Sequence, residues 1–165
     1  MVYIGIDPGQ TGGIATLDDT VSTVRYTSAD LIRILKKLKA ENKSIKVYVE
    51  EVHSMPHQGV RSMFTFGKGY GQILGILEAL EVKYELVTPN CWKKYVGVTH
   101  DKKTSIAKAQ KLFPDVSLLP TSKCRVPDDG LAEALLIAYY GKDSSQSFGG
   151  FKTKFKKVGK KNENW

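Results

Sequence analysis

Short runs of hydrophobic residues dominate the first part of the chain. Val2–Ile6 is apolar and rich in β-formers, and it stops at the turn Pro8-Gly9. Ile14–Leu17 and Val21–Tyr26 follow, separated by Asp18-Asp19, a pair typical of a hairpin turn. The pattern therefore predicts a three-stranded antiparallel meander at the start of the chain.

After the meander, the hydrophobic spacing alternates between that of helices and that of strands. Ser28 and Asp30 are candidate caps for a helix, because Leu31, Leu35 and Leu38 follow at helical spacing. The later elements that the pattern predicts are a strand over Ile45–Val49, a helix over Gly71–Leu80, a strand over Tyr84–Val87, a loop over Asn90–Lys103, a helix over Lys103–Phe113 and a final helix over Leu131–Tyr140, closed by Gly141. The stretch Gly59–Phe66 has no clear period.

This order of elements predicts an α/β fold. An antiparallel start followed by strand–helix–strand crossovers fits a five-stranded mixed sheet flanked by helices. We expect one domain over residues 1–141. Residues 142–165 are rich in Gly, Ser and Lys and have little to bury, so we expect a basic, flexible tail.

Charge narrows the classes of partner. The 165 residues carry a net charge of +8, with a pI near 9.4, which favours nucleic acid first and a membrane surface second. No apolar run approaches the length of a membrane span, and the start lacks a secretion signal, so we expect a cytoplasmic protein without a membrane partner. Cys91 and Cys124 form no C-x-x-C pair, and we expect ordinary thiols rather than a zinc site.

Two carboxylates follow predicted central strands. Asp7 comes directly after Val2–Ile6, and Glu50 directly after Ile45–Val49. If the strands are parallel neighbours, both acids lie at the edge where α/β sheets place their chemistry. The alternatives are a turn residue for Asp7 and a solvated acidic loop, with Glu51, for Glu50.

The final helix adds two more acids. Glu133 lies on the same face as Leu136 and Ile137, so it is expected at the edge of the packed surface, with Asp129 four residues earlier. A buried glutamate beside an aspartate needs a cation or a proton. Asp128 or Asp129 can also cap this helix, and for Asp129 the cap is as good an explanation as a metal.

Together the acids favour Mg²⁺, with Mn²⁺ as a substitute, over zinc, because the set offers oxygen ligands alone. In a basic protein this combination suggests phosphodiester hydrolysis assisted by two metal ions.

Three motifs resemble one known family. Tyr3–Gly9 (Y-I-G-I-D-P-G), Val47–Val52 (V-Y-V-E-E-V) and Asp128–Ala138 (D-D-G-L-A-E-A-L-L-I-A) resemble, in order, the acidic motifs of the RuvC-type Holliday junction resolvases. The segments M-P-H-Q-G-V, F-x-F-G and T-P-N-C-W-K-K look most like phage-borne members. The resemblance covers roughly residues 3–141 and implies a ribonuclease H-like fold. If the chain is phage-encoded, it also implies that the protein is located in the cytoplasm of a bacterial host.

The resemblance also implies catalytic and metal-binding roles for Asp7, Glu50 and Glu133. The family's usual spacing would put a fourth ligand at Gly130, which has no side chain, so Asp129 is the nearest substitute and Asp128 the next. It further implies a homodimer that nicks opposing strands of a four-way DNA junction. The glycines at four-residue spacing, Gly67, Gly71 and Gly75, mark a candidate dimer helix, or equally a core helix.

Basic and aromatic residues outside the acidic motifs are candidates for DNA contacts, as phosphate ligands or as stacking platforms. They are Arg61, Phe64 and Lys68 after the second motif, Lys93, Lys94, Lys102 and Lys103 before a predicted helix, and Arg125 before the third motif. Lys102 or Lys103 resembles a family lysine near the scissile phosphate. The alternatives are core anchoring for Phe64 and a solvated charge run for the lysines.

Three rival functions follow from the same residues. A phosphate-binding domain of the actin and sugar-kinase type also opens with G-I-D-x-G, but it needs two such domains and a glycine-rich phosphate loop, which this chain lacks. A non-catalytic nucleic-acid-binding protein would leave the acids without a role. A nuclease of broader fork or flap specificity would share every motif.

Overall fold

A computed structural model of the chain describes residues 1–9, 11–53 and 59–147. Its centre is a five-stranded sheet with the order β3-β2-β1-β4-β5. The strands are β1 (Val2–Ile6), β2 (Gly13–Leu17), β3 (Val21–Arg25), β4 (Ile45–Glu50) and β5 (Tyr84–Val87). The first three pair antiparallel, whereas β4 pairs parallel with both β1 and β5. The expected mixed, ribonuclease H-like sheet is confirmed.

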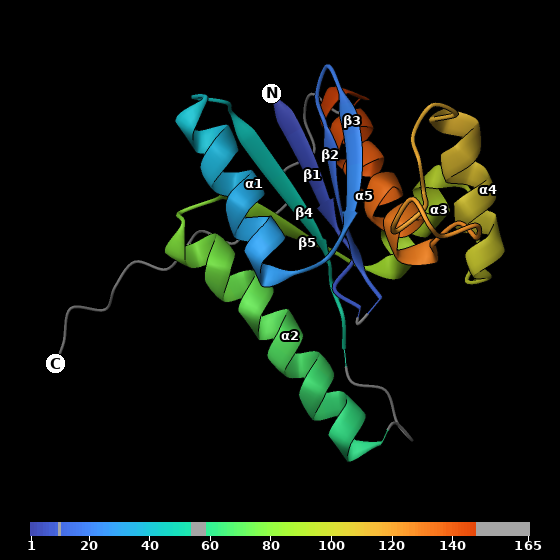
Figure 1. Cartoon of the computed structure of the whole chain (residues 1–165), viewed down its shortest axis with the longest axis horizontal. Coiled ribbons are helices and arrows are strands. Elements are labelled where there is room, and N and C mark those ends of the chain that lie inside the picture. Colours follow the sequence, from blue (N-terminus) through green and yellow to red (C-terminus); the bar gives the residue numbers. More distant parts are fainter. Residues whose placement is uncertain (10, 54–58, 148–165) are drawn as a thin grey trace, which may run out of the picture.

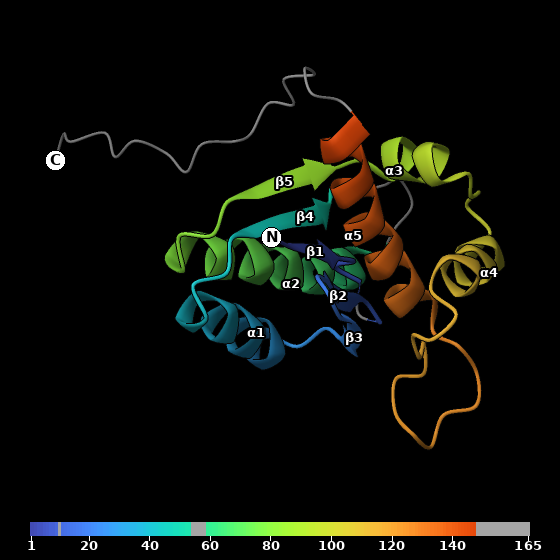
Figure 2. The same ribbon diagram turned by 90° about the horizontal axis from the view of Figure 1, so that it is seen from above.

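Helices cover both faces of the sheet (Figures 1 and 2). One face carries α1 (Ser28–Ala40) and α2 (Val60–Ala79), and the other carries α5 (Asp129–Ser147), with α3 (Pro89–Val96) and α4 (Lys102–Leu112) outside it. Each face has its own core, because alternate strand residues point to opposite sides. No helix in the described part of the chain is long and apolar enough to cross a membrane.

Several helices differ from those that the sequence predicted. The helix α1 is capped by Thr27, whose side chain accepts from the backbone N–H of Asp30, rather than by Ser28 or Asp30. The stretch 89–96, expected as loop, is the helix α3. The helix α5 continues past Gly141 to Ser147. The glycine makes room for the ring of Tyr48 and does not end the helix: a Cβ at Gly141 would lie only 2.3 Å from that ring.

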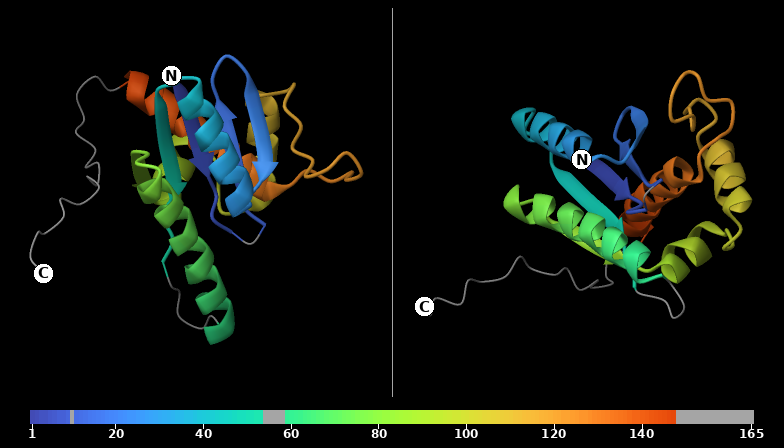
Figure 3. Two further views of the ribbon diagram at one scale, coloured as in Figure 1. Left: turned by 60° about the vertical axis from the view of Figure 1, so that its left-hand side comes forward. Right: turned by 60° about the horizontal axis from the view of Figure 1, so that its bottom comes forward.

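The helix α2 begins eleven residues before the predicted start at Gly71. Only Ile73 and Leu77, in its second half, are buried, so the first half carries no apolar period that a sequence pattern could reveal. This first half extends beyond the edge of the sheet (Figures 1 and 3). It presents Val60 and Phe64 to solvent, with the Phe64 residue 74% exposed.

Candidate active site

Strand register brings Asp7 and Glu50 together. Ile6 pairs with Val49 across the parallel β1–β4 ladder, so the next residues along, Asp7 and Glu50, lie beside each other at the carboxyl ends of the two strands. Alternation points both side chains to the α5 face, the face of Gly5 and Tyr48. By contrast, Glu51 is only partly buried, and its Oε1 lies 3.9 Å from Nε2 of His53.

The two adjacent aspartates at the start of α5 have different partners. Asp128 is the N-cap: its Oδ1 accepts from the N–H of Leu131 at 3.0 Å, and its Oδ2 is paired with the guanidinium of Arg25. Asp129 and Glu133 lie four residues apart on the helix and therefore share a face. Both add to the negative charge around Asp7. We call Asp7, Glu50, Asp129 and Glu133 the carboxylate cluster.

Close backbone contact fixes α5 against the strand ends. A Cβ at Gly130 would lie 2.1 Å from the carbonyl oxygen of Thr11, and one at Gly5 would lie 2.1 Å from that of Ala134. The position at which the resemblance would place a fourth ligand is therefore filled by backbone. An acid at residue 130 does not fit this packing. In this turn of the helix, Asp129 is the acid whose charge acts on Asp7.

Burial and mutual repulsion raise the pKa values of two of these acids. The pKa of Asp7 rises to about 7, chiefly through burial, then through the charges of Glu50 and Glu133, with a smaller part from Asp129. Burial also raises the pKa of Glu50, opposed by a hydrogen bond from Trp92. Concentrated, partly desolvated negative charge of this kind calls for a cation.

The helices α3 and α4 supply hydrogen-bond donors to the carboxylate cluster. The indole Nε1 of Trp92 donates to Oε1 of Glu50 at 2.9 Å. The ammonium of Lys93 donates to Oε1 of Glu133 at 2.6 Å, and the hydroxyl of Ser105 donates to the same oxygen at 3.1 Å. Lys102, the first residue of α4, is paired with Oδ2 of Asp129.

One feature is common to all four acids. Asp7 accepts a hydrogen bond of 3.3 Å from the backbone N–H of Gly9 through Oδ1, and the other three acids are likewise held through a single oxygen. Within the described residues, the second oxygen of each carboxylate accepts no hydrogen bond. Among the described residues, each acid of the carboxylate cluster is thus held through one oxygen only, which leaves the other oxygen without a protein donor there.

Lysine ammonium groups neutralise two acids of the carboxylate cluster. Within residues 1–9, 11–53 and 59–147, no group of three or more Asp, Glu, His or Cys side chains is placed so that it could hold one metal ion. Lys93 at Glu133 and Lys102 at Asp129 supply positive charge there instead. The donor set fits Mg²⁺ or Mn²⁺ in kind, and an ion that binds Glu133 or Asp129 would take over the role of an ammonium group.

The sequence did not reveal three residues of this site: Trp92, Ser105 and Arg25. The position of Trp92 depends on α3, whose signals are present in the chain. Thr88 caps the helix, Pro89 occupies its first turn and Gly97 ends it with a left-handed φ of 75°. No local signal links Ser105 to Glu133 or Arg25 to Asp128, because both contacts span distant segments.

The predicted DNA-contacting residues fall into two exposed regions and one enclosed position. Arg61, Phe64 and Lys68 lie on the projecting half of α2 and are all exposed. Lys94, Lys103 and Arg125 are exposed on α3, α4 and the loop before α5, respectively. Lys93 turns inward instead, with a side chain only 11% exposed.

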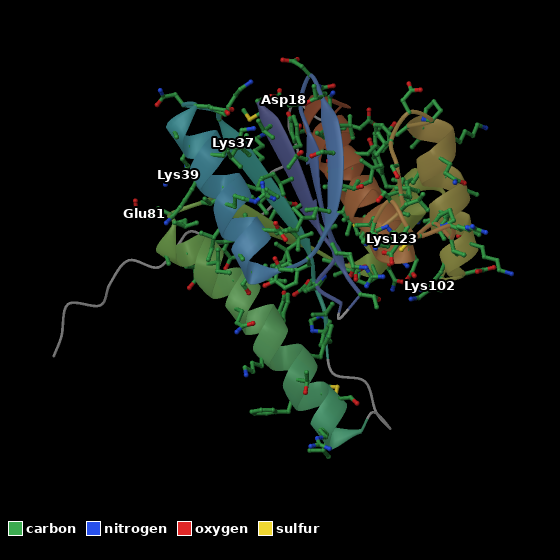
Figure 4. All side chains as sticks on the ribbon, in the orientation of Figure 1. Asp18, Lys37, Lys39, Glu81, Lys102 and Lys123 are labelled. Atoms are coloured by element: carbon green, nitrogen blue, oxygen red, sulfur yellow. The ribbon has the colours of Figure 1, made fainter. Side chains whose placement is uncertain are left out.

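The exposed lysines near the start of α5 lie at one end of the molecule. Figure 4 shows Lys102 and Lys123 there, and Lys37, Lys39 and Glu81 at the opposite end. The loop that carries Lys123 and Arg125 projects beside α4 (Figure 3). Positive side chains thus flank the carboxylate cluster on the α4 side.

Comparison with known proteins gives a match in structure and none in sequence. No protein-family model matches the chain, and no curated protein matches it. The structure of Thermus thermophilus RuvC in complex with a Holliday junction substrate is similar, with a TM-score of 0.58 and 18% identity over 89% of this chain and 96% of that one. A second structure of Thermus thermophilus RuvC gives a TM-score of 0.55 at the same identity and coverage. At this identity the likeness shows the fold alone.

Proposed function

We propose that this chain is a divalent-metal-dependent endonuclease that cuts branched DNA, with the four-way junction as its substrate. The observation that carries the proposal is the carboxylate cluster: four acids at the ends of β1 and β4 and on α5 gather at the carboxyl edge of the sheet. Burial, and after it the charges of the neighbouring acids, raise the pKa of Asp7 to about 7. Such a concentration of charge destabilises the fold, so it needs a functional reason.

Asp7, Glu50, Asp129 and Glu133 would hold two ions of Mg²⁺, or of Mn²⁺ in its place. Bound there, the ions would supply an activated water and stabilise the leaving oxygen of a phosphodiester. The chain's own residues prepare the site: Trp92 and Ser105 orient the two glutamates, and Lys93 neutralises Glu133 in the metal-free protein. A protein nucleophile is then not required.

Charge and shape support DNA as the substrate. The chain carries a net charge of +8, and exposed basic residues lie beside the carboxylate cluster on α4 and in the loop before α5. The projecting half of α2 adds an exposed aromatic ring, Phe64, between Arg61 and Lys68. Such a surface suits phosphates together with an unstacked base at a branch point. The lysine-rich tail would add salt-sensitive affinity.

Paired nicks require two active sites, and we infer a homodimer. The three glycines of α2 bear on this point, since a Cβ at Gly67, Gly71 or Gly75 would meet nothing within 4 Å. The helix α2 is a core helix through Ile73 and Leu77, but its glycines do not take part in that packing within the described part of the chain. An open, small-residue face on a projecting helix favours contact with a second copy.

The test is cleavage of a labelled four-way junction with and without Mg²⁺, beside a linear duplex of the same sequence. We expect symmetric, metal-dependent nicks in the junction, and their loss in Asp7→Asn. Junction binding without cutting under Mg²⁺ or Mn²⁺ would instead establish a non-catalytic binding protein. Equal cutting of forks and flaps would keep the nuclease and remove junction selectivity.

A further inference from the structure

Trp92 is the largest fully buried side chain of the molecule's described part, at 0% exposure. It belongs to the core on the α5 side of the sheet, among apolar side chains. An indole in such a place has to find an acceptor for its N–H. The acceptor that it reaches, at 2.9 Å, is Oε1 of Glu50.

The contact is directional, and it leaves the other oxygen of Glu50 available. The indole N–H donates to Oε1, and within the described residues Oε2 accepts no hydrogen bond. One side chain thus sets the orientation of Glu50.

The helix that holds Trp92 is capped at both ends. Thr88 caps the start of α3 with a hydrogen bond from the N–H of Cys91, and Gly97 closes its end. The next residue, Lys93, holds Glu133 and lies 4.9 Å from the centre of the Trp92 ring. Two consecutive residues of one short, capped helix therefore hold the two buried glutamates, each through Oε1.

We propose that Trp92 is a positioning residue, which holds Glu50 by Oε1 and leaves Oε2 as the oxygen that would bind a divalent ion. This inference rests on the proposed function, because it assumes that Glu50 binds metal. Partners of this kind contribute substantially to metal binding, and their loss costs roughly 10- to 100-fold in affinity. Trp92 acts through Glu50 and not on DNA.

The test measures Mn²⁺ binding by calorimetry in a Trp165→Phe background, in which Trp92 is the sole tryptophan. Trp92 is then replaced in two ways. Phe removes the N–H together with part of the ring. Benzothienylalanine, in which sulfur replaces the N–H, keeps the shape of the indole, so it remains informative if Phe leaves the core too loosely packed to fold. Thermal unfolding in EDTA confirms the folded state of each protein.

We expect both replacements to weaken Mn²⁺ binding about 10- to 100-fold, whereas Trp165→Phe alone binds as the unaltered protein does. We also expect Mn²⁺ to change the fluorescence of Trp92 in the Trp165→Phe protein, because the indole contacts a ligand of the ion. Equal Mn²⁺ affinity with and without the N–H would overturn the inference and leave the nuclease proposal intact. Absence of any Mn²⁺ binding to the unaltered protein would overturn both.

Discussion

Lys93 and Glu133 form a hydrogen-bonded ion pair of 2.6 Å in which both side chains are almost enclosed, at 11% and 10% exposure. The pair joins α3 to α5 across the carboxylate cluster. Enclosed pairs of this type contribute little net stability, but loss of one partner leaves the other charge uncompensated. The metal-free fold therefore depends on Lys93 more than its position in a run of basic residues indicates.

Substitution of Lys93 by Met should destabilise the metal-free protein by about 3–5 kcal/mol, because Glu133 loses its counter-charge. For a chain of this length that corresponds to a fall in Tm on the order of 10 °C. Thermal unfolding in EDTA measures the loss, and Mn²⁺ should restore most of it. Lys94→Met, at the exposed neighbouring position, is the matched control and should shift Tm little. A similar Tm for both variants would contradict the role given to Lys93.

Asp7→Asn should stabilise the metal-free protein while it abolishes cleavage. A carboxyl whose pKa rises from 3.8 to about 7 on folding opposes folding when it is ionised. This opposition is fully present above pH 7, diminishes as the pH falls towards 4 and is absent below the pKa of the unfolded chain. We expect a gain on the order of 2–4 kcal/mol at pH 8 and almost none at pH 4. Urea unfolding in EDTA at the two pH values measures it, and an equal effect at both would count against the raised pKa.

Gly130→Ala should disrupt the site without any change in its charges. The added methyl group would lie 2.1 Å from the carbonyl oxygen of Thr11, so α5 has to move away from the strand ends. We expect a loss of about 1–3 kcal/mol and a large loss of cleavage. Gly69→Ala in α2 is the control, because its Cβ would meet nothing within 4 Å, and it should gain up to roughly 1 kcal/mol through helix propensity. Denaturant titration of both variants gives the comparison.

Gly71→Arg should convert a dimer into a monomer if two copies meet through the glycine face of α2. Gly69→Arg adds the same charge two residues away, on another side of the helix, and should leave the dimer intact. Sedimentation velocity of the two variants separates the outcomes. In the Gly71→Arg variant we also expect single, uncorrelated nicks in a junction in place of paired ones. Dimers in both variants would place the interface elsewhere.

Phe64→Ala should weaken binding to a four-way junction without a cost in stability, because this residue is 74% exposed. Stacking of one base on an aromatic ring contributes about 1–3 kcal/mol, which corresponds to roughly 5- to 150-fold in affinity. Fluorescence anisotropy with a junction and with a linear duplex, in EDTA, measures the change, and we expect it for the junction alone. Phe64→Leu distinguishes stacking from simple apolar contact, since leucine keeps bulk and loses the ring face. Unchanged junction affinity in Phe64→Ala would remove the ring from the DNA surface.

The strands and the pairing of Asp7 with Glu50 were predictable because strand signals are local. The run Tyr84–Val87 and the start of Ile45–Glu50 were located to the residue, and parallel pairing of β1 with β4 then brings the two acids together. A strand that is buried on both faces of a parallel sheet is a continuous apolar run in the sequence, and the turns at its ends mark its bounds. The mixed sheet followed from the order of these runs.

The roles of the two adjacent aspartates were not predictable in the same way. Asp128 and Asp129 are equally good caps by sequence, and the pairing that distinguishes them is with Arg25, a residue 103 positions away in the sequence. The helix α3 was missed for a different reason: it is only eight residues long, and its buried face consists of Trp92 and Val96 alone, too few residues to establish a period, although the cap and closing glycine were visible. Long-range partners and short helices are therefore the parts of the site that local patterns leave open.

The projecting half of α2 has little reason to stay helical by itself. Gly67, Gly69 and Gly71 lie within five residues, each costing up to roughly 1 kcal/mol against alanine, and the start of the helix at Gly59 has no side-chain cap. Its backbone hydrogen bonds face water and gain nothing from packing. Amide hydrogens there should exchange with solvent far faster than those around Leu77, and a bound surface should slow them. A second copy or a DNA branch that covers the projecting half of α2 would stabilise its helical state. Part of the binding free energy is then consumed in ordering this segment, so only a partner whose shape fits the helix binds tightly.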